Sequence, residues 1–338
     1  MLTLSSCTGL RDADETRAST GGAGRPTQTD SPVVTVPTNA TENTPDTKAQ
    51  TDGTDTSSAT PTPTPGELNF PTDFSFLDTV QKGNFSDTAA DDPNGTWYPG
   101  KTTRDLVTGE VTYNWDRAAD VFECMDKYNG IYRGSDAQKV IYLTFDCGYE
   151  YRPADGSYPN GVTDDILNTL KEKNAPGTFF VTGDYIKSEP GLVKRMLDEG
   201  HIVGTHTMHH YNMTTLTPEE FVAEIKDNND LLKETVPTAP DMVFYRPPEG
   251  GANEWTMALA CRMGLTTVFW SAIQPMDHDV NGQLDPETVL YNDEVKLHNG
   301  CVYLLHAVST TNAKILGDLI DYARGEGYEI RALSEFVR

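Results

Sequence analysis

The side chains of this sequence that could take part in chemistry share one feature, because each lies at or shortly after the end of an apolar, strand-like run. They are Asp146, Cys147, His206, His210, Arg246, Asp277 and His306. If those runs form parallel strands, the carboxyl ends of the strands lie on one face of the sheet, where such folds place catalysis. Carboxylates, imidazoles and a thiol gathered there could bind a metal ion and exchange protons.

The segment HTMHH, residues 206–210, has the most informative spacing in the chain. A turn of helix would present His206 and His210, four residues apart, to one metal ion, and His209 would point elsewhere. Two surface histidines on a loop are the alternative. The predicted presence of Asp146 and His306 on the same face favours the metal site.

The other side chains also have ordinary interpretations. Asp146 is followed closely by a glycine and could cap a turn, Cys147 could be an inert buried thiol, and Arg246, before two prolines, could be a salt-bridge partner. Taken together, these interpretations require several polar groups to share one end of a sheet by chance. We therefore expect them to form one site.

The elements that must position these residues alternate regularly from Val140 onward. Six helix-like segments separate the strands, and the clearest begins at Thr217 with a capping box closed by Glu220. The predicted strands are 140–145, 177–181, 201–205, 242–246, 266–270, 301–306 and 328–333. Parallel strands need crossover connections and are buried on both faces, so we predict an α/β fold, a distorted (β/α)7 barrel. An open doubly wound sheet is the alternative, but the sequence lacks its usual glycine-rich phosphate loop.

Composition divides the chain of 338 residues into three parts. Residues 1–66 are rich in Thr, Pro, Ser and Gly and contain no aromatic residue, so we predict a disordered tether. Residues 67–135 are expected to form an irregular extension that packs as a cap on a catalytic domain at 136–338. The net charge of −25 would be repelled by phosphate backbones, which argues against nucleic acid as a partner.

The start LTLSSC resembles a bacterial lipoprotein signal, with Cys7 as the residue that would carry lipid and anchor the protein to a membrane. Only six residues precede Cys7, and they lack the basic start and the long apolar run of a signal peptide. A chance Leu-Ser-Ser-Cys is the alternative. We expect no other segment to span a membrane.

Five motifs of the chain resemble those of the NodB-homology polysaccharide deacetylases, carbohydrate esterase family four. They are TFDCGYE, HTMHH, RPPEG, FWSAIQPMDHD and LLHAVS, and the resemblance covers about Tyr128 to Arg338. It is closest to the branch that deacetylates muramic acid and makes the δ-lactam of spore peptidoglycan. The resemblance therefore implies a metal-dependent hydrolase of the cell envelope that acts on an acetylated glycan.

The resemblance implies one divalent metal ion, held by His206 and His210. Cys147 occupies the position at which most of the family has an aspartate as third ligand, while the muramic branch often has asparagine. A thiolate would complete a site that favours zinc, with cobalt or manganese also possible. A protonated thiol would instead take no part in metal binding, and both alternatives stay open here.

The resemblance also assigns the proton transfers. Asp146 would be the general base that takes a proton from water, kept ionised by Arg246. His306 would protonate the departing amine. Asp277, or the nearby Asp279, would orient that histidine.

The predicted reaction is metal-dependent removal of acetyl groups from amino sugars of peptidoglycan, with N-acetylmuramic acid as the favoured target. Alternatives are N-acetylglucosamine in peptidoglycan or chitin oligomers, an acetylated hemicellulose, or a catalytically decayed glycan-binding protein. The insertion at 151–165 is expected to overhang the active face and to shape the glycan groove. We expect a monomer outside the cytoplasm, either a lipid-anchored lipoprotein or a secreted protein, with a role in sporulation.

Overall fold

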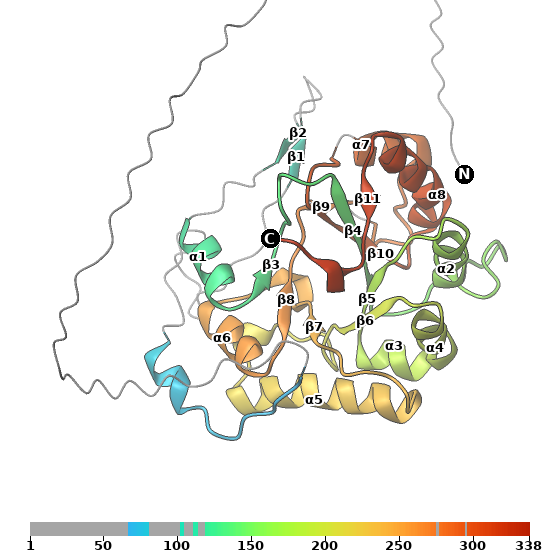
Figure 1. Cartoon of the computed structure of the whole chain (residues 1–338). Coiled ribbons are helices and arrows are strands. Elements are labelled where there is room, and N and C mark those ends of the chain that lie inside the picture. The colour runs from blue at the N-terminus through green and yellow to red at the C-terminus, as the bar shows by residue number, and fades with distance from the viewer. Residues whose placement is uncertain (1–66, 81–101, 105–110, 114–118, 275–276, 295) are drawn as a thin grey trace, which may run out of the picture. The chain divides into compact units, whose positions relative to one another are not determined.

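A computed structural model describes residues 67–80, 102–104, 111–113, 119–274, 277–294 and 296–338. At its centre lies one sheet in which every strand pairing is parallel (Figure 1). The strands are β3 (Gly130–Ile131), β4 (Val140–Cys147), β5 (Thr178–Val181), β6 (Ile202–Thr205), β7 (Phe244–Tyr245), β8 (Thr266–Val268), β9 (Ala272–Ile273), β10 (Cys301–His306) and β11 (Glu329–Ile330). Their order across the sheet is β3, β8, β7, β6, β5, β4, β10 and β9, and β11 pairs with β4.

Helices connect the strands and surround the sheet (Figure 1). They are α1 (Ala119–Lys127), α2 (Val162–Glu172), α3 (Gly183–Ser188), α4 (Pro190–Asp198), α5 (Pro218–Thr235), α6 (Glu254–Arg262), α7 (Pro286–Glu294) and α8 (Thr310–Gly325). Helix α5 begins with the predicted capping box, in which the side chains of Thr217 and Glu220 each accept the backbone N–H of the other residue. The predicted α/β fold is confirmed, as a half-barrel of parallel strands with helices outside.

Each of the predicted strand segments contains a strand, but the ends of the sheet differ from the prediction. Strands β7 and β11 have two residues each, and β3 and β9 were not predicted because two residues show no alternation. Strand β3 lies in the segment 67–135, for which the sequence predicts a cap, and it extends the sheet by pairing with β8. A separate antiparallel pair is formed by β1 (Thr102–Arg104) and β2 (Val111–Tyr113).

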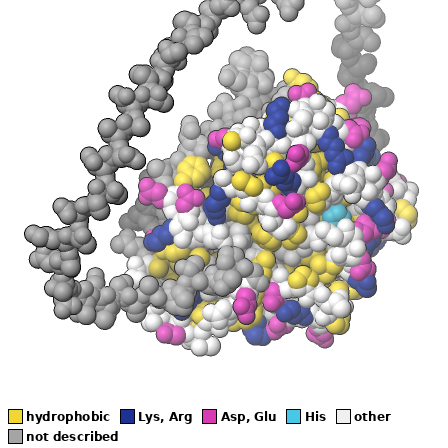
Figure 2. Space-filling view, viewed as in Figure 1, with side chains coloured by type: hydrophobic (Ala, Val, Ile, Leu, Met, Phe, Trp, Pro, Cys, Tyr) yellow, Lys and Arg dark blue, Asp and Glu magenta, His cyan; other side chains and the backbone are white. Residues whose placement is uncertain are grey.

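The predicted tether and Cys7 lie within residues 1–66, outside the described residues. Among the described residues, no helix combines the length and the apolar character that a membrane crossing requires. On the face shown in Figure 2, Lys and Arg side chains lie among Asp, Glu and apolar side chains and form no continuous basic stripe.

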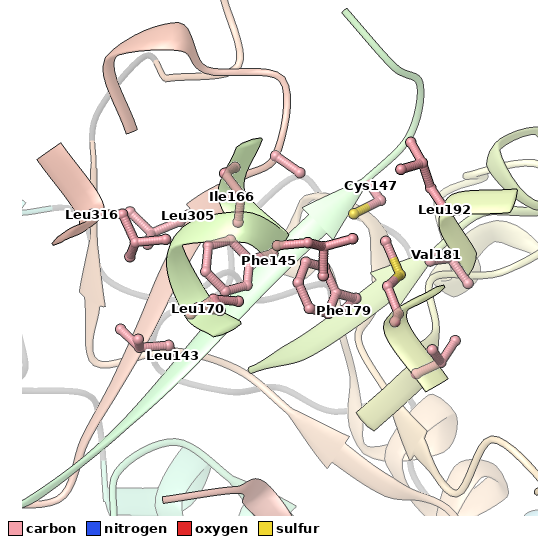
Figure 3. Packing of buried hydrophobic residues seen from close by; sticks show 14 of the residues in the cluster. Leu143, Phe145, Cys147, Ile166, Leu170, Phe179, Val181, Leu192, Leu305 and Leu316 are labelled. Atoms are coloured by element: carbon pink, nitrogen blue, oxygen red, sulfur yellow. The ribbon is translucent and has the colours of Figure 1, made fainter. Parts of the chain in front are cut away.

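An apolar core fills the space between the sheet and the helices outside it (Figure 3). Phe145 of β4 stacks on Phe179 of β5 with ring centroids 4.9 Å apart, and Leu170 of α2 belongs to the same cluster. Side chains alternate between the two faces of a strand. Phe145 and Cys147 therefore enter this core, while Asp146 between them points to the other face and lines a pocket.

The strand register brings the predicted site residues together. Strand β10 pairs with β4 so that His306 lies opposite Asp146. Thr205, the last residue of β6, pairs with the last residue of β7. The residues that directly follow these strands, His206 and Arg246, therefore lie at the same level of the sheet.

Candidate active site

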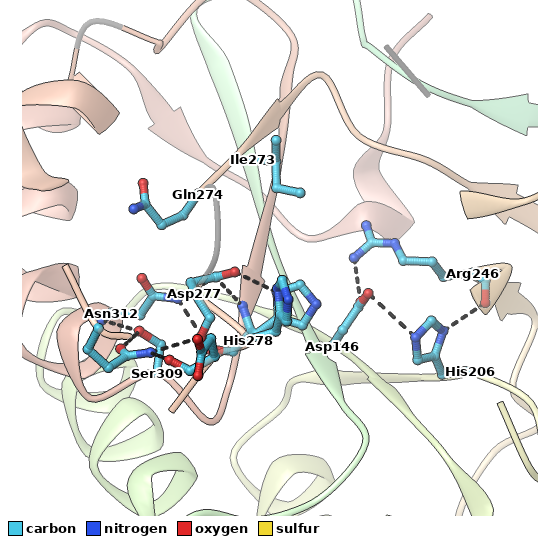
Figure 4. Close-up of polar contacts among 12 residues, drawn as sticks. Asp146, His206, Arg246, Ile273, Gln274, Asp277, His278, Ser309 and Asn312 are labelled. Atoms are coloured by element: carbon cyan, nitrogen blue, oxygen red, sulfur yellow. Dashed lines mark hydrogen bonds and ion pairs between the residues drawn. The ribbon is translucent and has the colours of Figure 1, made fainter. Parts of the chain in front are cut away.

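Asp146 and Arg246 form a buried ion pair at the centre of the site (Figure 4). Nη1 of Arg246 donates to Oδ1 of Asp146 at 2.7 Å, and the two residues are 0% and 7% exposed, respectively. Nε of Arg246 donates to the backbone carbonyl of Val268, and Nη2 donates to the Thr144 hydroxyl and to the backbone carbonyl of Phe269. Burial acts most strongly and would raise the pKa of Asp146, but the charge and hydrogen bond of Arg246, together with the nearby His206 and His306, outweigh it, and the pKa lies below its ordinary value. Asp146 is therefore an ionised carboxylate held in one orientation.

One ring nitrogen of His206 is fixed by a hydrogen bond, and the other is left with a lone pair. Nδ1 lies 2.9 Å from the backbone carbonyl oxygen of Arg246, and since a carbonyl only accepts, Nδ1 carries the proton. Nε2 lies 3.6 Å from Oδ2 of Asp146. Burial lowers the pKa of His206 to about 4, so the ring is neutral at physiological pH. A neutral imidazole whose other nitrogen is held by a carbonyl is the form that binds a metal ion.

His210 lies beside His206, but a helical turn does not bring it there. The segment between them is a loop in which Thr207 and His210 have φ angles of 68° and 59°, in the left-handed region that residues other than glycine rarely adopt. The Thr207 hydroxyl accepts the backbone N–H of His210 at 2.9 Å. The two imidazole rings have centroids 4.8 Å apart and are inclined at 77°. The structure thus brings the two imidazoles together, while the predicted turn of helix is wrong.

His209, for which the sequence predicts no role, lines the same pocket. Its Nδ1 lies 2.6 Å from Oε1 of Glu224, and its backbone N–H donates to Oε2 of the same carboxylate at 2.9 Å. Tyr211 stacks on the ring of His209 with centroids 5.3 Å apart. Glu224 of α5 therefore anchors the loop that carries His206 and His210, a contact between distant parts of the chain that the sequence pattern did not reveal.

Cys147 does not join the two histidines. Its side chain is 0% exposed and packs in the apolar core with Phe179 and Val181, away from the pocket that Asp146 lines (Figure 3). Burial raises the pKa of the Cys147 thiol well above its usual value, whereas a metal ligand must be a thiolate. We therefore remove Cys147 from the candidate ligands and assign it a place in the core.

This placement gives a prediction for two variants of Cys147. We expect Cys147→Ala to leave metal affinity unchanged, because the thiol faces the core. Cys147→Ser should also keep that affinity but lower the free energy of unfolding by about 1–3 kcal/mol, since its hydroxyl has no partner there. Metal titration and denaturant unfolding measure the two quantities. A fall in metal affinity in both variants, at unchanged fold, would restore the thiol as a ligand.

Asp277 and His306 form the second polar cluster of the site (Figure 4). Oδ1 of Asp277 lies 2.7 Å from Nδ1 of His306, and Oδ2 accepts the backbone N–H of His306 at 2.7 Å. Burial acts to lower the pKa of His306, but the charge of Asp277 and its hydrogen bond outweigh it, and the pKa is raised above its ordinary value. Asp279 instead accepts the backbone N–H of Asn281. Of the two acids left open by the sequence, Asp277 is the one that contacts His306.

Asn312 of α8 is a residue of this cluster that the sequence did not indicate. Its Nδ2 donates to Oδ2 of Asp277 at 2.7 Å and to the backbone carbonyl of His306 at 3.2 Å. Gln283 donates to the backbone carbonyls of Asp277 and Asp279 at 3.2 and 2.7 Å. These bonds fix the loop that carries Asp277 to the start of α8, so Asp277 is held independently of its bond to His306.

Of the site residues, Asp146, His206, His210 and His306 line one pocket of about 710 Å³. Its lining comes from segments that follow several strands: Asp146, Gly148, Tyr149, Thr182, Asp184, His206, His209, His210, Glu249, Trp270, Ile273, His278, Leu304, His306 and Val308. The insertion at 151–165 contributes no lining residue, so the predicted overhang is wrong. It packs to one side, where Arg152 forms an ion pair with Glu189 and the Tyr158 hydroxyl donates to the backbone carbonyl of Thr310.

The buried ion pair gives a prediction for stability. Arg246→Met should lower the free energy of unfolding at neutral pH by about 3–5 kcal/mol, because it leaves the carboxylate of Asp146 buried without its partner. The double variant Arg246→Met/Asp146→Asn should regain part of that loss, since no charge remains buried. Denaturant unfolding of the single and double variants measures both. A single variant as stable as the wild type, or a double variant less stable than the single one, would contradict this account.

Parallel strands that bring a buried carboxylate, an imidazole pair and a carboxylate-bound histidine to one end of a half-barrel point to a hydrolytic enzyme. A sequence profile described as "Polysaccharide deacetylase" matches residues 133–268. The peptidoglycan-N-acetylmuramic acid deacetylase PdaA of Bacillus subtilis (strain 168) is 36% identical over 222 residues, which are 66% of this chain and 80% of that protein. The chain therefore belongs to the polysaccharide deacetylase family.

Solved structures of related proteins have the same fold. The structure of Bacillus subtilis PdaA, described as a family 4 carbohydrate esterase, has 34% sequence identity and a TM-score of 0.62, covering 72% of this chain and 98% of that one. A family 4 carbohydrate esterase from Bacillus anthracis has 34% sequence identity and a TM-score of 0.53, and the match covers 71% of this chain and 97% of that one.

A further relative is known from its sequence. A peptidoglycan-N-acetylglucosamine deacetylase of Bacillus cereus is 29% identical over 205 residues, which are 60% of this chain and 89% of that protein.

Proposed function

We propose that this protein hydrolyses the acetamide group of amino sugars in peptidoglycan, with N-acetylmuramic acid as the favoured target. The observation that carries the proposal is the pairing of Asp146 with His306 across β4 and β10, beside the imidazoles of His206 and His210. A candidate proton acceptor and a candidate proton donor beside one candidate metal site support the proposal. The similarity to the N-acetylmuramic acid deacetylase PdaA supports the choice of sugar.

The residues of the pocket suit each step of such a hydrolysis. A divalent cation held by His206 and His210 would polarise the acetamide carbonyl and acidify the attacking water. Asp146, kept ionised by Arg246, takes a proton from that water as its oxygen bonds to the carbonyl carbon. His306 gives a proton to the nitrogen as the carbon–nitrogen bond breaks. The products are acetate and a free amino sugar.

Two imidazoles suit zinc, which we propose as the metal, with cobalt and manganese as alternatives. Action on peptidoglycan implies that the protein works outside the cytoplasm. We further propose that it is a monomer and that lipid on Cys7 anchors it to a membrane. The resemblance to the muramic branch supports a role in sporulation. The assembled pocket argues against a decayed glycan-binding protein, because Asp146, His206 and His306 all keep contacts suited to their proposed roles.

Acetate release from purified muropeptides tests the proposal. The wild-type protein is stripped with a chelator and assayed with and without added zinc, cobalt or manganese, on muropeptides with and without the stem peptide. We expect metal-dependent release of acetate and mass spectra that show de-N-acetylated muramic acid. Absence of acetate release from every glycan tested, in protein that is folded and loaded with metal, would overturn the proposal.

A second candidate reaction, on N-acetylglucosamine, is favoured by one observation. The pocket lining includes the carboxylates of Asp184 and Glu249, and no lysine or arginine among the described residues lines it. Once the stem peptide has been removed, the lactyl group of muramic acid carries a negative charge that this lining would not neutralise. Loss of acetate from the glucosamine residues of the same muropeptides, with muramic acid left acetylated, would establish this alternative.

A further inference from the structure

A second group of potential metal ligands lies in the pocket, on the other side of Asp146 from His206 (Figure 4). One ligand atom from each of Asp277, His278 and His306 lies within 4.8 Å of the others. Two nitrogens bound to one zinc ion, each at about 2.0–2.1 Å, lie at most about 4.2 Å apart. Since 4.8 Å is the upper bound on these separations, the group needs to close by at most about 0.6 Å to reach that limit.

His278 can supply that adjustment. It is exposed and lines the pocket, so its ring can move toward the ring of His306, whose centroid lies 5.6 Å away at an inclination of 62°. The backbone carbonyl of His278 lies 3.5 Å from the Tyr149 hydroxyl, and this contact involves no ring atom. Closing the group thus requires rotation of one exposed side chain and leaves the buried residues in place.

The surroundings of His306 are those of a metal-binding histidine. Its Nδ1 is engaged by the carboxylate of Asp277 at 2.7 Å, which leaves Nε2 as the nitrogen that can coordinate. A carboxylate behind an imidazole fixes the tautomer and increases the basicity of the free nitrogen. The same contact that suits His306 for proton transfer therefore suits it for binding a metal ion.

The charge of the pocket favours a second cation as well. The charge of Asp146 is paired with Arg246, but the carboxylates of Asp184 and Glu249 also line the pocket, and no lysine or arginine is among its described lining residues. An excess of negative charge in a concave site raises the local concentration of cations. The candidate ligands near β10 share no residue with the imidazole pair after β6, so both sites could be filled at once.

We infer that His278 and His306, backed by Asp277, form a second cation site, at which zinc in excess of one equivalent binds and inhibits the enzyme. An ion on Nε2 of His306 takes the lone pair through which this residue would exchange its proton with the substrate nitrogen. Imidazole ligands select zinc and copper over manganese and magnesium, which prefer oxygen ligands. Excess zinc should therefore inhibit at concentrations at which excess manganese does not.

Zinc titration of the metal-stripped full chain tests this site directly. We expect two zinc ions per wild-type chain, the second bound more weakly, and we expect His278→Ala to weaken the second binding event by about tenfold or more. His209→Ala is the matched control for the second event, because His209 lines the same pocket outside the group, and it should keep that event. Circular dichroism and melting temperature check that each variant is folded.

Activity provides a second readout, which rests on the proposed function. With each variant normalised to its own maximum, acetate release by the wild type should rise and then fall with zinc, and in His278→Ala the fall should require at least about tenfold more zinc. One zinc ion per wild-type chain, or a second event unchanged in His278→Ala, would overturn the inference. Failure to release acetate would contradict the proposed function and leave the binding experiment decisive for the second site.

Discussion

His206→Ala is expected to abolish tight metal binding and to reduce acetate release on the order of 10³-fold, because a Lewis acid contributes several kcal/mol to such a reaction. His206 is buried, its Nδ1 donates to the backbone carbonyl of Arg246, and its Nε2 faces Asp146. His210 alone could not hold the ion in that position. Metal content of the purified variant and acetate release from muropeptides measure the two effects.

His209→Ala separates this prediction from a general disturbance of the loop. His209 follows His206 by three residues and is held by Glu224, so its loss affects the loop without removing a proposed ligand. We expect it to retain one tightly bound metal ion. If His206→Ala binds metal as tightly as the wild type, the imidazole pair is not the catalytic metal site.

The core of the sheet could be predicted from the sequence because its two longest strands, β4 and β10, are apolar. Segments such as 140–145 and 301–306 read as continuous apolar runs, which is typical of parallel strands buried on both faces. The capping box at the start of α5 is a local signal that needs only four residues. Strands β3 and β9 have two residues each, so they carry no periodic signal, and their place depends on neighbours distant in the chain.

The sequence left open whether Cys147 binds the metal, and its place in the core has a simple physical origin. The sequence suggested a strand that ends at Phe145, after which both following side chains could turn toward the pocket. Strand β4 in fact continues to Cys147, and side chains along a strand alternate between faces. Because the side chain of Asp146 points toward the pocket, the side chain of Cys147 must point toward the core.

Other features of the site depend on contacts that no local pattern reveals. The positive φ angles of Thr207 and His210 replace the expected helical turn, and a β-branched residue such as Thr207 is not expected to adopt that conformation. Asn312 reaches Asp277 across 35 positions of the chain. Position after a strand therefore identified which residues meet, while their orientation and supporting contacts required the packed structure.

His306→Ala is expected to reduce kcat/KM by about 10²- to 10⁴-fold, the usual contribution of a general acid, while one tightly bound metal ion is retained. Asp277→Asn tests how the acid is tuned. The negative charge of Asp277 raises the pKa of His306 against the opposing effect of burial, so its removal should lower that pKa. Because the protonated ring is the active form, activity is lost as pH rises through this pKa, and the alkaline limb of the kcat/KM profile should move to lower pH.

The dependence of kcat/KM on pH is measured for each variant at one equivalent of metal, so that the proposed second cation site stays empty. Asp279→Asn is the matched control, since Asp279 lies two residues from Asp277 and its carboxylate accepts the backbone N–H of Asn281. We expect its alkaline limb to coincide with that of the wild type. If Asp277→Asn keeps the wild-type limb, or Asp279→Asn moves it, then Asp277 does not set the protonation of His306 and the assignment of the acid pair is wrong.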